Sequence, residues 1–402
     1  MPRTFIRLLG PALLGVTLAG APAPAGAQDQ QPTEFQTWHV PGWTFTPGVI
    51  VGGLYDSNVT LLATLPSQQS ASDKLFELEP FGQIEFFGPR TTLNGGYHGS
   101  VQRYFQFNEL DAVDHRAFLQ MRTRVTRRLT VFLNENFSQV PSTDQLVLNG
   151  VPFERSPARY NSASGGFEAR LSRTTDWTTR YEMTWVDFLR KDTLLTGGIV
   201  HGVRNSLAHR FTDRVSLGGE YEFRWASMNE GTREQMFQDA GMVFRYRVGE
   251  ATSFEAAGGV AHLSDQLTGL TRTGPYVRAE LVHRTARATV GAEFNRSYVP
   301  SVAFGGTNQT ERARAYIMMP LSRNRFYIQE SLAWHHTDPF DPRVLPLYST
   351  WLDTVVGYAV QRWVRLEGYH ELTHQDTRLP GGLINRQVVG VRFVISQPVR
   401  IQ

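Results

Sequence analysis

The run HELTH at residues 370–374 matches the H-E-x-x-H pattern of zinc proteases. That chemistry needs a helix, in which histidines four residues apart lie one turn apart and can bind one zinc ion. Residues 364–369 instead alternate between apolar and polar side chains, which is typical of a strand. In a strand the two histidines would lie about 13 Å apart, too far to share an ion. We therefore predict no metal site and no metalloprotease here.

Two other places carry groups that could do chemistry. Asp56 and Asn58 follow the apolar, glycine-rich run 48–55, so they either form a metal or catalytic corner or mark the end of a strand. His335 and His336 precede a polar loop, where solvated histidines are far commoner than metal ligands. No nucleophile elbow or phosphate-binding loop occurs. We predict no cofactor and no catalytic residues, although a barrel enzyme that assembles its site from separate strands is an open alternative.

Period-two alternation dominates the rest of the chain. In residues 116–125, Ala117, Leu119 and Met121 alternate with arginine, phenylalanine and glutamine side chains. A strand places these two sets on opposite faces, whereas a helix would distribute the arginines around every side. The same alternation recurs over 214–226 and in many other segments. The fold class that we predict is therefore all-β.

Segment number and connection length indicate a membrane barrel. About 18 strands (16–18) are expected, starting near residues 43, 74, 91, 115, 129, 160, 175, 194, 214, 236, 252, 273, 286, 310, 326, 349, 364 and 386. Connections after even strands are short, whereas most of those after odd strands are long and polar. This asymmetry is typical of a transmembrane antiparallel up-and-down β-barrel with short periplasmic turns and long extracellular loops.

The N-terminus predicts export. Arg3 and Arg7 precede a weakly apolar run, and Ala25-Gly26-Ala27 resembles a cleavage site. We expect a Sec-type signal peptide at 1–27, a periplasmic segment at 28–42 and an outer-membrane barrel at 43–402 in a Gram-negative bacterium. After the signal no run of 18 apolar residues occurs, so no spanning helix is expected. The 40 basic and 37 acidic residues are interspersed, which argues against a nucleic-acid partner.

Aromatic residues near the predicted strand ends are candidate membrane anchors. Trp177 and Trp185 share one strand face and lie about 20 Å apart along the barrel axis, close to the spacing of aromatic girdles. The predicted anchors are Trp43, Tyr55, Trp177, Trp185, Trp225, Trp334, Trp351 and Trp363. The partners expected from this surface are outer-membrane lipid and lipopolysaccharide.

Charged side chains on the opposite strand face are predicted to line the lumen. They are Arg116, Arg122, Arg124, Arg180, Glu182, Glu220, Glu222, Arg224, Arg245, Arg278, Glu280, Glu293, Arg312 and Arg314. Ion pairing between neighbouring strands accounts for much of this set. Arg122, Arg124, Arg312 and Arg314 are the better candidates for unpaired charges that would favour anions. The loop 138–159 could fold inward and narrow the lumen.

Four short motifs resemble a family of β-barrel porins associated with capsule and exopolysaccharide genes. They are Tyr55-Asp56-Ser57-Asn58, the run from Asp73 to Pro80, Gly88-Pro89-Arg90 and Gln102-Arg103-Tyr104. The resemblance implies an outer-membrane barrel with a role in polysaccharide secretion, and it brings no catalytic residues.

The function that we predict is passive transport of polar or anionic solutes through a porin-like channel, to which the resemblance adds a link with exopolysaccharide secretion. Polysaccharide or its export machinery would then be a partner. The alternatives are a non-conducting docking barrel of a polysaccharide secretion complex and, third, a barrel enzyme.

Overall fold

The computed structural model describes residues 41–62, 71–146, 151–190, 195–229, 231–285, 287–302, 306–321, 325–341, 344–377 and 382–401. The predicted signal peptide and nearly all of the predicted periplasmic segment lie outside these residues. Among the described residues, no helix has the length and apolar character needed to cross a bilayer.

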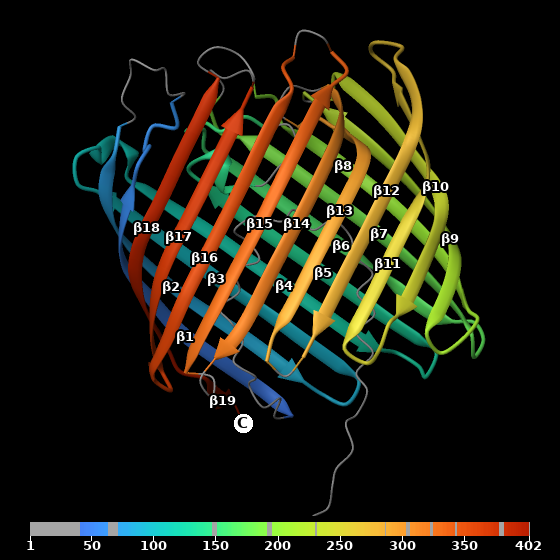
Figure 1. The fold of residues 1–402 in the computed structure, drawn as a ribbon, viewed down its shortest axis with the longest axis horizontal. Helices are drawn as coiled ribbons and strands as arrows, with labels where there is room; N and C mark the ends of the chain where they lie inside the picture. The colour runs from blue at the N-terminus through green and yellow to red at the C-terminus, as the bar shows by residue number, and fades with distance from the viewer. Residues whose placement is uncertain are drawn as a thin grey trace, which may run out of the picture.

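The chain folds into a single closed antiparallel sheet (Figure 1). The strands are β1 (Gly42–Asp56), β2 (Asp73–Phe87), β3 (Thr91–Tyr104), β4 (Ala112–Arg124), β5 (Leu129–Val140), β6 (Ala158–Arg170), β7 (Thr175–Phe188), β8 (Gly198–Arg210), β9 (Val215–Met228), β10 (Arg233–Arg247), β11 (Thr252–Asp265), β12 (Thr271–Arg284), β13 (Thr289–Pro300), β14 (Thr307–Leu321), β15 (Phe326–Pro339), β16 (Leu347–Gln361), β17 (Val364–Asp376), β18 (Leu383–Ser396) and β19 (Val399–Ile401). Each strand pairs with its neighbour in sequence, and β1 closes the barrel by pairing with both β2 and β18. The prediction of an 18-stranded up-and-down barrel is confirmed, because β19 continues β18 along the same edge of β1.

Prolines account for two irregular positions in this sheet, near Pro47 and Pro398 and at Pro80. Proline has no amide hydrogen to donate to a neighbouring strand. Pro398 separates β18 from β19, and the amide of Gln397 there bonds to the carbonyl of Pro47 at 3.3 Å. Pairing between β2 and β3 is interrupted at Glu79 and Pro80. Pro47 and Pro80 therefore lie at or beside local breaks in the ladder.

The two rims differ as the connection lengths predicted. Short turns, including 88–90, 171–174 and 211–214, lie at the rim that carries the C-terminus, at the bottom of Figure 1. The longer connections lie at the other rim, and two of them contain short 3-10 helices, η2 (Asn108–Leu110) and η3 (Thr143–Gln145). We call these the turn rim and the loop rim.

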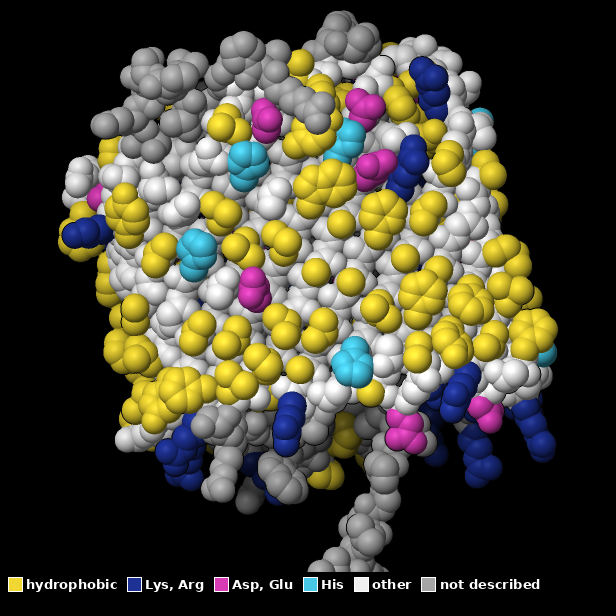
Figure 2. Space-filling view, in the orientation of Figure 1, with side chains coloured by type: hydrophobic (Ala, Val, Ile, Leu, Met, Phe, Trp, Pro, Cys, Tyr) yellow, Lys and Arg dark blue, Asp and Glu magenta, His cyan; other side chains and the backbone are white. Residues whose placement is uncertain are grey.

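An apolar band surrounds the outside of the barrel, and Lys and Arg side chains gather below it at the turn rim (Figure 2). Among the predicted anchors, Trp43, Tyr55, Trp177 and Trp363 are exposed on the outer surface, at 38–45% of their accessible area. Trp185, Trp225 and Trp334 are half-buried.

Trp351 corrects the anchor prediction. It is only 5% exposed and packs edge-on against Phe153, with ring centroids 5.2 Å apart. On β16 it alternates in phase with Asp353 and Val355, which line the lumen with it. Trp351 therefore points inward. The error arose because a position near a strand end does not show which face of the sheet a side chain occupies.

An apolar cluster fills part of the barrel interior near the loop rim. Phe188, Met228, Phe237 and Leu263 from β7, β9, β10 and β11 are almost fully buried. They form one cluster with Leu146, Val151, Leu195 and Val302 from the loops. Burial of this surface stabilises the inward position of the loops and closes the upper interior along β6–β13.

Candidate functional site

The described parts of the connection between β5 and β6, residues 141–146 and 151–157, fold inward as the sequence analysis allowed. Thr143 stabilises it internally: its hydroxyl donates to the carbonyl of Pro152 at 2.6 Å and accepts from the amide of Glu154 at 2.8 Å. These bonds hold η3 and the returning segment side by side. We call residues 141–146 and 151–157 the inner loop.

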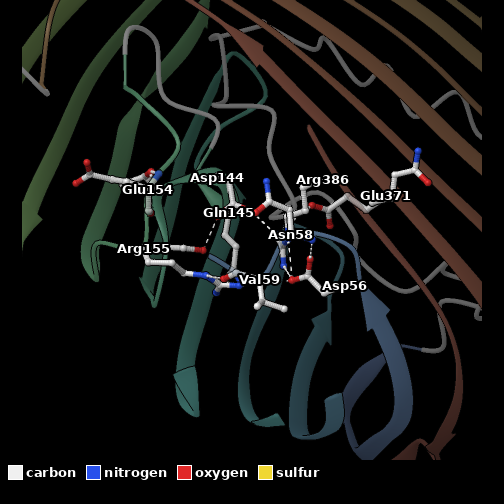
Figure 3. A network of polar contacts seen from close by, with 12 residues as sticks. Asp56, Asn58, Val59, Asp144, Gln145, Glu154, Arg155, Glu371 and Arg386 are labelled. Atoms are coloured by element: carbon white, nitrogen blue, oxygen red, sulfur yellow. Dashed lines mark hydrogen bonds and ion pairs between the residues drawn. The ribbon is translucent and has the colours of Figure 1, made fainter. Parts of the chain in front are cut away.

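Arg386 of β18 attaches the inner loop to the barrel wall (Figure 3). Its guanidinium donates to Asp144 of η3, and it lies 2.9 Å from the carboxylate of Asp56 at the end of β1. All three side chains are buried, with 5% exposure for Arg386, 0% for Asp56 and 2% for Asp144. A buried arginine shared by two carboxylates is a strong, directional contact, and it joins segments far apart in the sequence.

Arg155 makes a second attachment from the other end of the inner loop. Its guanidinium donates to the carbonyl of Val59 at 2.6 Å and to the hydroxyl of Tyr104 at 3.2 Å, and lies 3.5 Å from Asp56. Asp56 in turn accepts from the amide of Asn58 at 2.9 Å. Asp56 and Asn58 thus have a structural role, because Asp56 helps to attach the inner loop to the barrel wall.

A third contact places the loop against β16 and β17. The amide of Phe153 donates to the side chain of Gln375 at 2.8 Å, and Gln375 donates to the carbonyl of Val151 at 3.2 Å. Phe153 packs on Trp351. The inner loop therefore crosses from β5–β6 to the opposite side of the lumen.

A polar compartment lies beside the inner loop. Its walls come from β1–β4, from β14–β18 and from η3. Its charged lining residues include Glu77, Glu79, Arg116, Asp144, Arg314, Asp353, Glu371, Arg386 and Arg392. Glu79 and Asp353 make no hydrogen bond or ion pair with another described residue. Their carboxylates are therefore available to a solute or to water. We call this space the open compartment.

The wall formed by β7–β12 has a different character. Glu222 lies 2.6 Å from Arg204 and 3.4 Å from Arg224, and Arg224 lies 2.6 Å from Asp239. These four side chains are at most 15% exposed. We call this wall the paired wall.

The pairing continues across β11 and β12. Arg278 lies 3.1 Å from both Glu220 and Glu255, and Glu255 also binds Arg245 at 2.7 Å. Tyr276 donates its hydroxyl to Glu220 at 3.0 Å. The Glu255 contacts join adjacent strands, as ion pairing between neighbouring strands predicts, whereas the Arg278–Glu220 contact spans from β12 to β9.

The predicted filter arginines do not form one group. Arg122 binds Glu168 through two nitrogens, at 3.0 and 2.5 Å, so the prediction that it is unpaired is wrong. Arg124 donates to the carbonyl of Pro89 at 2.9 Å, at the turn rim. Arg116 lines the open compartment and donates to Gln145 of η3 at 3.4 Å.

The remaining candidates lie on both sides of the lumen. Arg314 lines the open compartment and donates to Ser331 at 3.2 Å. Arg312, on the same face of β14, is opposite the buried ring of His335. Arg180 lies 3.0 Å from Glu182 on its own strand.

Glu280 and Glu293 are cross-strand neighbours on β12 and β13. Glu280 is also opposite Glu255, and Glu293 is opposite Arg314. The parity prediction placed these two carboxylates on the same face of the sheet. They are groups of like charge and do not neutralise each other.

The HELTH motif lies in β17, not in a helix. Glu371 lines the open compartment, and His370 and His374 therefore point to the other face of the strand. No cluster of three or more potential metal ligands occurs among the described residues. The geometry agrees with the sequence argument against a zinc site.

Several important residues were missed by the sequence analysis. Arg204, Asp239 and Glu255 lie on the inward parity of their strands, so the alternation pattern could have identified them. Asp144 and Arg386 were not predicted to meet, since 242 positions separate them and nothing local in either segment signals the contact.

Comparison with known proteins gives remote similarities. No family model and no curated protein sequence matches the chain. Among solved structures, the chain is similar to OpdK of Pseudomonas aeruginosa, a structure with vanillate, at 10% identity and a TM-score of 0.43, covering 89% of this chain and 99% of that one. It is also similar to OccAB4 of Acinetobacter baumannii, at 10% identity and a TM-score of 0.44, covering 89% and 98%. The siderophore receptor PirA from Pseudomonas aeruginosa matches at 7% identity and a TM-score of 0.41, covering 89% and 80%.

Proposed function

We propose that this protein is a passive channel of the bacterial outer membrane for small polar solutes. The open compartment is the observation that carries the proposal. A closed barrel with an apolar outer band is compatible with a bilayer, and the polar interior beside the inner loop is the part of the lumen that a hydrated solute would contact.

The lining of the open compartment supports a solute with hydroxyl or charged groups. Arg116, Arg314 and Arg392 offer planar donors, and Glu79 and Asp353 offer acceptors. Fixed donors and acceptors replace part of a solute's hydration shell while it passes. A preference for anions is a more specific proposal than a channel for polar solutes. It rests on Arg122, Arg124, Arg312 and Arg314, and the pairing of Arg122 with Glu168 weakens it.

Conductance across a planar bilayer tests the proposal. We expect discrete openings in KCl, a zero-current potential that reports the preferred ion, and entry of small neutral sugars into proteoliposomes. Heat-dependent gel mobility confirms that the same sample is folded. A folded barrel that conducts no ions and admits no sugar would contradict the channel and favour the docking barrel.

The link to exopolysaccharide secretion is a narrower proposal still. Its support is the resemblance of the four short sequence motifs. Deletion of the gene with measurement of surface polysaccharide tests it: unchanged polysaccharide, with a conducting channel, would remove this link and leave the channel function intact.

A further inference from the structure

A polar row interrupts the apolar outer surface of β15–β17. Thr354 of β16 is directly opposite Glu330 of β15 on one side and His370 of β17 on the other. The outer positions on either side of this row along the strands are apolar, among them Ile328, Leu332, Leu352, Val356 and Leu372.

The facing of Glu330 and His370 is fixed by their neighbours in sequence. Ser331 accepts a hydrogen bond from Arg314 inside the lumen. Glu330, the preceding residue, borders the open compartment, but strand alternation and its exposure place its side chain on the outer face. Glu371 lies 3.9 Å from Arg386 inside the barrel, so His370 also points outward. These contacts fix the outward facing of both side chains.

The row lies near the middle of the apolar band. On β15, Glu330 is halfway between Phe326, at the turn-rim end, and the half-buried Trp334, toward the loop rim. Figure 2 shows an acidic and a histidine side chain within the yellow band, away from both rims. Ionisable groups that face hydrocarbon are unfavourable at this depth.

Two other outward-facing carboxylates of the barrel, Glu135 and Glu311, have partners. Glu135 accepts a hydrogen bond from Asn161 at 3.2 Å, and Glu311 lies 3.5 Å from Arg296. Glu330 and His370 make no hydrogen bond, ion pair or ring contact with another described residue. The row therefore has polar groups that its own barrel leaves unsatisfied.

We propose that this face binds a second copy of the same chain, with the two barrels related by a twofold axis along the membrane normal. That axis reverses left and right, so Glu330 of each copy meets His370 of the other, and Thr354 meets Thr354 near the axis. The acid, the hydroxyl and the imidazole are thus self-complementary in charge and in hydrogen-bonding capacity.

The position of the charges favours a twofold dimer over a ring. A ring of three or more copies pairs two different surfaces of each barrel. Here the complementary groups lie on one surface, two strand spacings or about 10 Å apart. An isologous contact is the arrangement that brings both of them together at once.

Cysteine cross-linking in membranes tests the contact. The chain has no cysteine, so a single introduced thiol gives no background. We expect Thr354→Cys to form covalent dimers with a short bifunctional maleimide. Leu207→Cys on β8 is the matched control, since Leu207 is 51% exposed on the far side of the barrel. Cross-linking of Thr354→Cys no greater than that of the control, or to a different protein, would overturn the proposal.

Charge exchange tests the pairing itself. Because each dimer contains two Glu–His contacts, Glu330→Gln should raise the dimer dissociation constant about tenfold in detergent. Glu330→His alone should weaken the dimer at least as much, and Glu330→His combined with His370→Glu should restore it. Heat-dependent gel mobility keeps folding separate from association. Failure of the double exchange to restore the dimer, with folding intact, would reject this pairing.

Discussion

The open compartment and the paired wall are built from the same residue types but are arranged for different purposes. In the paired wall, Arg224 contacts Glu222 on its own strand and Asp239 on the adjacent strand, and the cluster is largely removed from water. In the open compartment, Glu79 and Asp353 have no such partner among the described residues. Charge on a barrel's inner face is therefore insufficient to identify a filter. Whether a neighbouring strand neutralises the charge decides whether a solute can use it.

The inner loop separates these two regions. Its apolar residues complete the cluster against β6–β13, while its polar residues Asp144 and Gln145 face the compartment. Placement of the loop thus leaves the passage off-centre, along β1–β4 and β14–β18. Three predictions test this division, from the largest expected effect to the smallest.

The largest effect is expected from Arg386→Met, which removes one of the three attachments of the inner loop, the one to β18. Asp56 and Asp144 would be left buried without their shared cation, so we expect a loss of about 3–5 kcal/mol in the free energy of unfolding. We also expect a larger single-channel conductance, because the loop is released from β18. Guanidinium titration in lipid vesicles and bilayer recording measure the two effects.

The matched control removes the exposed pair Arg122–Glu168 with Arg122→Gln and Glu168→Gln together. Arg122 is 41% exposed, so the expected change is below about 1 kcal/mol. Equal destabilisation by both variants, with unchanged conductance in each, would show that the Arg386 contact does not hold the loop.

An intermediate effect is expected from Arg224→Met in the paired wall. Asp239 would lose its arginine in a poorly solvated position, and we expect destabilisation of about 3 kcal/mol. The zero-current potential should change less than in the double variant Glu79→Gln, Asp353→Asn, since Arg224 is not among the residues that line the open compartment. A larger change in ion preference from Arg224→Met would place the solute path along the paired wall.

The smallest effect on stability is expected from Glu79→Gln combined with Asp353→Asn. These carboxylates have no partner to lose among the described residues, so unfolding should change by less than about 1 kcal/mol. The ratio of cation to anion permeability should fall about threefold, because two negative charges beside the solute are removed. An unchanged zero-current potential would exclude the open compartment as the place where ions are discriminated.

Alternation alone predicted most of the fold. Strand starts agree with the sequence to within a few residues, since a two-residue period and short turns are properties of local sequence. The same rule assigned Glu182, Glu222 and Arg278 to the lumen. The anchor prediction was wrong for Trp351, where proximity to a rim was taken as evidence of facing.

The pairing pattern was harder to predict than the parity. The alternation of side chains along a strand predicts that Arg122 and Glu168 both face inward. Their contact, however, depends on the register in which β4, β5 and β6 pair. Each further strand adds an uncertainty in register, so the division of charges into paired and free was beyond the sequence.

By itself the sequence determined an all-β barrel, its two unlike rims, its apolar exterior and its charged interior, because each of these follows from side-chain period and connection length. Tertiary structure alone decided that Asp56, Asp144 and Arg386 meet, that the inner loop divides the lumen, and that Glu330 faces the bilayer opposite Thr354. Those features depend on contacts between segments remote in the chain, and on strand registers that only barrel closure fixes.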